Sequence, residues 1–154
     1  MIDLSAVQNL VSSWWFDYDQ GNFDIWPEYF ASQARFECRS DKGDTEFETF
    51  FRADLTGRDE VLAWHIDHRK NSPYPLRHNA TNVHVTRNRG DEVDFRAYLF
   101  VTQIVGGAVS NLSSGYCLGT VRLEDGEARF STIRVILDYA ESETFSSARR
   151  FDMV

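Results

Sequence analysis

The stretch LSAVQNLVSSWWFDYDQGN, residues 4–22, decides how this fold begins. Its apolar residues recur at spacings of three and four, the period of one helix face. They are Leu4, Val7, Leu10, Val11, Trp14, Trp15 and Tyr18. The pattern predicts an amphipathic helix over residues 5–18, with Ser5 as its N-cap and the run 20–22 as its end.

An acidic residue follows this apolar face at its far end. Asp19 comes four residues after Trp15 and eight after Val11, so it shares their face. A carboxylate beside aromatic side chains is unfavourable unless it has a partner or a catalytic task. The best partner in the sequence is His78, which opens a predicted strand. We therefore expect these two distant residues to meet.

The rest of the chain predicts helices followed by long strands. Residues 23–30 and 57–69 are expected to be helical, residues 34–39 a strand, and residues 40–55 a hairpin or a loop. Further strands are expected over residues 76–86, 93–105, 114–123 and 128–139. This order indicates an α+β domain with a curved sheet over helices. The length predicts a single domain, residues 1–154.

Composition narrows the classes of partner. The net charge of −8 disfavours nucleic acid, because phosphate binding needs a basic surface. No stretch is apolar enough to span a bilayer and no signal segment is visible, so we expect a cytoplasmic protein without a membrane partner. Twelve Phe, six Tyr and four Trp suit a core, and also a pocket for a hydrophobic small molecule.

Two other histidines suggest a metal site, which the spacing does not support. His65 and His68 lie three residues apart on a predicted helix, as some metal ligands do. No third ligand follows at a matching spacing, and the run HIDHRK, residues 65–70, is typical of a solvated helix face. We therefore expect no metal, and His84, near the turn at residues 87–91, is expected to be exposed.

Five stretches carry a resemblance to a known superfamily. They are YDQGNFDIW (residues 18–26), GRDEV (57–61), RHNATNV (77–83), GYC (115–117) and LEDG (123–126). With these stretches in this order, the chain resembles the SnoaL-like branch of the nuclear transport factor 2-like superfamily. The resemblance implies a cone-shaped α+β fold, with N-terminal helices packed on a strongly curved, mixed and mostly antiparallel sheet. It also implies a homodimer or homotrimer.

Scytalone dehydratase, a member of this superfamily, suggests roles for three residues. Its Tyr-Asp pair and its strand histidine correspond to Tyr18, Asp19 and His78. The resemblance implies that Asp19 and His78 act as an acid/base pair, while Tyr18 donates a hydrogen bond to a substrate oxygen. Two positions depart from that enzyme: its second catalytic histidine falls near Gln103, and another substrate-holding tyrosine falls near Cys38. Both departures argue against the same substrate.

The first functional interpretation is therefore a cofactor-independent lyase or isomerase, resembling a dehydratase or polyketide cyclase. Its substrate would be a hydrophobic cyclic molecule, such as a polyketide, an aromatic or a steroid-like compound. Trp15, Trp26, Asn82 and Tyr116 are the candidate substrate contacts. Asn82 is included because it lies four residues after His78, on the same face of a regular strand.

Two other interpretations remain open at this point. Asp19 could cap the loop at residues 21–22 while His78 is a hydrogen-bonded core histidine, with no catalysis. The chain also shares the pattern at residues 77–83 with the beta subunits of ring-hydroxylating dioxygenases. That resemblance implies a non-catalytic subunit beside a separate oxygenase large subunit, or a small-molecule-binding module.

Overall fold

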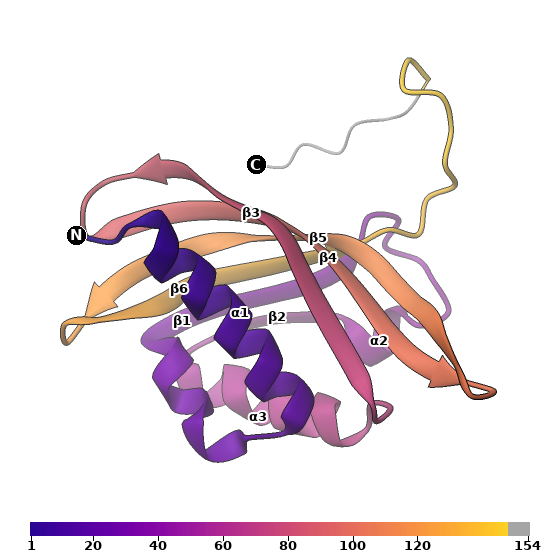
Figure 1. Ribbon diagram of the computed structural model, residues 1–154, viewed down its shortest axis with the longest axis horizontal. Helices are drawn as coiled ribbons and strands as arrows, with labels where there is room; N and C mark the ends of the chain where they lie inside the picture. Colours follow the sequence, from indigo (N-terminus) through magenta and orange to yellow (C-terminus); the bar gives the residue numbers. More distant parts are fainter. Residues whose placement is uncertain (148–154) are drawn as a thin grey trace.

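The computed structural model describes residues 1–147 and shows helices on one face of a curved sheet (Figure 1). The elements, in chain order, are α1 (Leu4–Gln20), the 3-10 helix η1 (Phe23–Tyr29), β1 (Phe30–Ser40), α2 (Glu48–Phe51), β2 (Ala53–Thr56), α3 (Arg58–Lys70), β3 (Leu76–Asn88), β4 (Glu92–Val105), β5 (Ala108–Glu124) and β6 (Glu127–Leu137). The expected α+β class is confirmed.

The sheet has six strands in the order β2-β1-β6-β5-β4-β3. Every neighbouring pair is antiparallel except β1 and β6, which run parallel. This confirms a mixed, mostly antiparallel sheet. Helix α1 packs on β3, and α3 packs on β1, so the inner face of the sheet is covered from both edges. The space between these two helices and the sheet holds the site described below.

Helix α1 is delimited by local hydrogen bonds that place its last turn. The side chain of Asp3 accepts a hydrogen bond from the amide of Ala6 at 2.8 Å, so Asp3 is the N-cap. The prediction of Ser5 as N-cap is wrong, because Ser5 lies in the first turn and donates its hydroxyl to Asp3. The helix ends at Gly21, whose φ of 69° is left-handed. Asp19 therefore lies within the last turn.

The segment predicted as a hairpin or a loop contains a short helix and a strand instead. Helix α2 is held by Glu48, a buried side chain that accepts hydrogen bonds from the amide of Ser40 and the hydroxyl of Thr45. Strand β2 then pairs with β1. Four residues are too few to display a helical period, so the sequence pattern gave no sign of α2.

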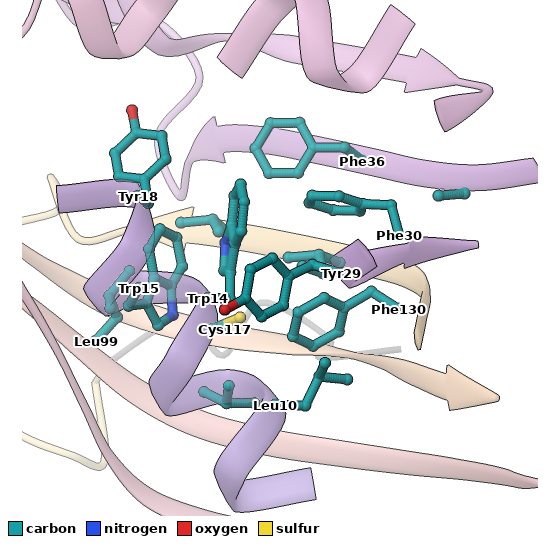
Figure 2. Close-up of a cluster of buried hydrophobic side chains, with 14 of the residues drawn as sticks. Leu10, Trp14, Trp15, Tyr18, Tyr29, Phe30, Phe36, Leu99, Cys117 and Phe130 are labelled. Atoms are coloured by element: carbon teal, nitrogen blue, oxygen red, sulfur yellow. The ribbon is translucent and has the colours of Figure 1, made fainter. Parts of the chain in front are cut away.

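Aromatic side chains fill the core around Trp14 (Figure 2). Its ring centroid lies 4.8 Å from that of Phe30, 5.3 Å from Trp26 and 5.2 Å from the imidazole of His65, mostly in edge-to-face geometry. Tyr18 lies at the edge of this cluster, and its hydroxyl points away from it. The apolar face of α1 therefore packs in the core along most of its length. Its last turn instead carries two polar groups, the Tyr18 hydroxyl and the Asp19 carboxylate.

Candidate functional site

A cavity of about 270 Å³ lies between α1, α3 and the inner face of the sheet. Most of its lining is apolar or aromatic and comes from both helices, from all strands except β2 and from the segment around α2. Phe47, Phe50 and Leu112 line it and are each about half exposed, at 54%, 48% and 47%, so they form its rim. The cavity is thus open at one side and suited to an apolar ligand.

Asp19 and His78 are in contact, as the sequence predicted. The carboxylate of Asp19 accepts two hydrogen bonds from His78, one from the backbone amide at 2.7 Å and one from Nδ1 at 2.6 Å. The side chains are only 5% and 11% exposed. An ionised carboxylate has no proton to donate, so Nδ1 carries the hydrogen. His78 lines the cavity, and its ring stacks on Trp15 at 4.5 Å between centroids.

Tyr18, the residue before Asp19, holds a second imidazole. Its hydroxyl lies 2.6 Å from Nδ1 of His68, and both residues line the cavity. Burial raises the pKa of Tyr18 far above its ordinary value. Burial, together with the electrostatic effect of the nearby His78 and Arg69 side chains, lowers the pKa of His68 to about 4. Both members of this pair are therefore neutral at pH 7.

The helix that carries His68 is not the solvated face that the sequence suggested. His65 is buried, and its Nδ1 donates to the carbonyl of Val61 at 2.7 Å. Burial lowers the pKa of His65 to about 3, so it is neutral as well. Val61, His65 and Arg69 recur every four residues on the buried face of α3. That four-residue period was visible in the sequence, but two of its three members, His65 and Arg69, are residue types that more often face solvent.

Arg69 holds the end of α1 in place. Its guanidinium donates to the carbonyls of Tyr18 and Asp19, with the shortest contact at 2.8 Å to Asp19, and to the carbonyl of Pro73 at 3.1 Å. The last carbonyls of a helix carry its negative end, which a cation stabilises. The sequence did not single out Arg69. Its contacts fix the backbone that carries Tyr18 and Asp19, which hold the imidazoles of His68 and His78.

Three of the predicted substrate contacts lie away from the cavity. Trp26 is fully buried in the core, where its indole donates to the carbonyl of Asp17. Tyr116 lies opposite Tyr98 on the outer face of the sheet. Asn82 is exposed, because a bulge interrupts the register of β3 between Thr81 and His84 and gives Asn82 a φ of 54°. Their assignment as substrate contacts is therefore corrected, whereas Trp15 does line the cavity.

The remaining expectations concern a metal site, a membrane span and three further positions. Within residues 1–147, no cluster of three or more histidine, cysteine or acidic side chains could hold a metal ion. In the same part of the chain, no helix is both long and apolar enough to cross a membrane. His84 is exposed, as predicted. Cys38 lines the cavity and Gln103 does not. Besides His78, the imidazoles that line the cavity are those of His65 and His68, which come from α3 rather than from β4.

Comparison with known proteins identifies the family. The model of the SnoaL-like domain matches residues 1–134. A sequence search of curated proteins found no significant match. Solved structures with the same fold include an NTF2-like protein with a cystatin-like fold from Novosphingobium aromaticivorans, which is 18% identical and gives a TM-score of 0.69 over 86% of this chain and 80% of that one.

Two further structures with this fold have names that refer to a reaction. The beta subunit of benzoate 1,2-dioxygenase from Burkholderia mallei is 18% identical, with a TM-score of 0.67 over 89% of this chain and 91% of that one. A candidate scytalone dehydratase from Novosphingobium aromaticivorans is 13% identical, with a TM-score of 0.70 over 96% and 94%. At such identities the likeness shows the fold alone. The family match over most of the chain goes further: this protein belongs to the SnoaL-like domain family.

Proposed function

We propose that this protein is an acid/base lyase or isomerase that acts on a hydrophobic cyclic small molecule without a cofactor. The observation that carries the proposal is the buried contact between Asp19 and His78, with His78 at the wall of an apolar cavity. A carboxylate on Nδ1 orients an imidazole and stabilises its protonated form, which suits a proton carrier.

The reaction would begin with proton transfer to His78. Its Nε2 takes a proton from a carbon next to a carbonyl. The electron pair of that C–H bond forms a C=C bond while the π pair of the carbonyl moves onto its oxygen, which gives an enolate. Asp19 stabilises the imidazolium that forms, and the Tyr18 hydroxyl donates to the enolate oxygen. The imidazolium then returns its proton, either to another carbon, which gives an isomer, or to a departing hydroxyl, which leaves as water.

The cavity favours a small, uncharged substrate. Its volume of about 270 Å³ lies at the lower end of the range for small-molecule sites, which fits one or two rings better than a steroid. Its lining within the described chain contains no lysine or arginine, so a carboxylate or phosphate ligand would lack a counter-charge. We therefore favour an aromatic or small polyketide ketone as the substrate class.

Exchange of hydrogen for deuterium would test this proposal without knowledge of the natural substrate. We would incubate the protein with 2-tetralone, an uncharged bicyclic ketone, in D₂O and follow the loss of its α-proton signals by NMR. The wild-type protein should accelerate exchange above the buffer rate, and Asp19→Asn and His78→Phe should abolish the acceleration. His84→Ala, which removes an exposed histidine of the same strand, is the matched control. Equal acceleration by all four proteins would refute the proposal.

A second candidate function rests on the likeness to dioxygenase beta subunits. Under it, the protein is a non-catalytic subunit that assembles with an oxygenase large subunit, or a module that only binds a small molecule. The outer face of the sheet exposes Tyr98 and Phe100, which would suit contact with another chain, including a homodimer or homotrimer. A stable complex with an oxygenase large subunit, together with no exchange activity, would favour this candidate over the enzyme.

A further inference from the structure

Two consecutive residues of α1 each hold one cavity imidazole by its Nδ1 atom. Tyr18 lies 2.6 Å from Nδ1 of His68, and Asp19 lies 2.6 Å from Nδ1 of His78. Each imidazole also stacks on an indole, His68 on Trp64 at 4.7 Å and His78 on Trp15 at 4.5 Å. The two pairs differ in one respect: a carboxylate only accepts hydrogen bonds, whereas a tyrosine hydroxyl can donate or accept.

The other nitrogen of His68 indicates which way the Tyr18 bond runs. Nε2 of His68 is buried and has no hydrogen-bond partner in the described part of the chain. A neutral imidazole carries one N–H, on either nitrogen. If Tyr18 donated to Nδ1, the N–H would be on Nε2, buried and without an acceptor. Buried N–H groups without a partner are rarer than acceptors without one. The favoured arrangement therefore has Nδ1–H donating to the tyrosine oxygen.

The surroundings of the pair agree with this direction. Ser72, the cavity-lining hydroxyl next to this pair, donates its proton to the carbonyl of His68 at 2.7 Å. The groups that face His68 are His78 from β3, Arg69 and Asp67 from its own helix, and Tyr18 from α1. Burial, His78 and Arg69 lower the pKa of His68 and Asp67 raises it, with the net result that the imidazole is neutral at pH 7. The Tyr18 hydroxyl points away from the packed core (Figure 2) and lies at the cavity wall, where it also faces the hydroxyl of Ser72, so the cavity side is where its proton can meet a ligand oxygen.

We propose that His68 is a positioning residue: by donating to the Tyr18 oxygen, it turns the Tyr18 proton toward the cavity, where it binds a carbonyl oxygen of an uncharged one- or two-ring ligand. The inference rests on the cavity being the ligand site of the proposed function. It adds a specificity rule to that function. A ligand needs an acceptor oxygen at Tyr18, and a ligand that offers only a donor there binds less well.

The first test needs no ligand. Histidine side chains labelled with ¹⁵N report by NMR which ring nitrogen carries the hydrogen. We expect His68 to be neutral between pH 6 and 8, with its hydrogen on Nδ1. A hydrogen on Nε2, or a protonated ring in this range, would overturn the proposal. Because the measurement uses the ligand-free wild-type protein, it does not depend on catalysis or on how a variant folds.

The second test measures the hydrogen bond that Tyr18 would donate. The infrared carbonyl stretch of bound 2-tetralone, labelled with ¹³C at its carbonyl, should move to lower frequency in the wild-type protein. Tyr18→Phe and His68→Phe should lose this displacement and bind about 5-fold more weakly, the size expected for one hydrogen bond. His68→Phe keeps a ring against Trp64, so it isolates the hydrogen bond from the stacking.

A rescue variant and a control complete the design. His68→Asn places an amide N–H near the position of Nδ1 and should restore most of the displacement, whereas His84→Ala should leave it unchanged. If the carbonyl stretch of bound 2-tetralone moved as far in His68→Phe as in the wild-type protein, the proposal would be overturned. A normal displacement without any hydrogen–deuterium exchange would refute the proposed catalysis and leave the role of His68 supported, so the two failures are distinguishable.

Discussion

A double-mutant cycle at Asp19 and His78 would measure how strongly this buried pair is coupled. In the folded protein the carboxylate accepts two hydrogen bonds, at 2.7 Å from the backbone amide and 2.6 Å from Nδ1. Asp19→Ala leaves both donors without a partner, at about 1–3 kcal/mol each. His78→Phe keeps a ring against Trp15 but leaves a buried carboxylate with one donor, which should cost about 3 kcal/mol.

The double variant keeps only one of these defects, the unpaired amide of residue 78. Its loss of unfolding free energy should therefore be smaller than the sum of the single losses by about 4–6 kcal/mol, which is the cost of the unpaired Nδ1–H plus that of the carboxylate with one donor. Urea denaturation at pH 7 measures all four proteins. The exposed ion pair of Arg35 and Asp54 provides a control cycle, which should give about 0.5 kcal/mol. A coupling at Asp19 and His78 no larger than this control would refute the reasoning.

Three other substitutions test the packing of the sheet and of α3. Gly119→Ala places a Cβ 2.1 Å from the backbone oxygen of Thr132, so β5 and β6 must separate, and urea denaturation should show a loss of about 1–3 kcal/mol; an unchanged midpoint would contradict this. Arg69→Met removes the guanidinium from the carbonyls of Tyr18, Asp19 and Pro73, of which that of Tyr18 keeps the amide of Gly21, and should cost about 3 kcal/mol, with Arg69→Lys recovering less than half. His65→Phe should flatten stability against pH between pH 4 and 6. In that window the unfolded chain, with a histidine pKa near 6.5, binds a proton that folded His65, with a pKa of about 3, does not, so acidification destabilises the wild type by up to about 1.4 kcal/mol per pH unit more than the variant.

The last turn of α1 was largely predictable, because its signals are local. The apolar face ends at Tyr18, Asp19 follows it, and Gly21 ends the helix two residues after Asp19. Asp19 and His78 are 59 residues apart, and their meeting followed from a simple physical expectation: a carboxylate at the end of an apolar stripe needs a partner. The resemblance to a known superfamily then pointed to one histidine among four.

The side of the cavity formed by α3 was not predictable in the same way. Hydropathy treats His65, His68 and Arg69 as surface residues, and their burial is acceptable only because specific acceptors meet them. Those acceptors are the carbonyls of Val61, of Tyr18 and Asp19, and the hydroxyl of Tyr18. Three of these four acceptors lie on another helix, so the pattern of α3 alone contains no sign of them.

Asn82 shows a second limit of prediction from sequence: a bulge shifts the alternation of side chains between the two faces of a strand. Leu76, His78 and Ala80 face the core from even positions, whereas beyond the bulge the core-facing residues are Val83 and Val85. The change of parity comes from one residue, Asn82, in a left-handed conformation that asparagine tolerates better than most. Counting by twos from His78 therefore placed Asn82 on the wrong face.

The end of α1 also explains how the fold tolerates a carboxylate at an unfavourable position. The C-terminal end of a helix is its negative end, so Asp19 is destabilised there by the helix itself. Arg69 neutralises the nearby carbonyls, and His78 provides two donors to the carboxylate. Removing Arg69 should thus disturb Tyr18 and Asp19 together, although Arg69 is not among the residues that line the cavity. If Arg69→Met left the NMR signals of both His68 and His78 unchanged, the two imidazoles would have to be positioned by α3 and β3 alone, and the last turn of α1 would not be their common support.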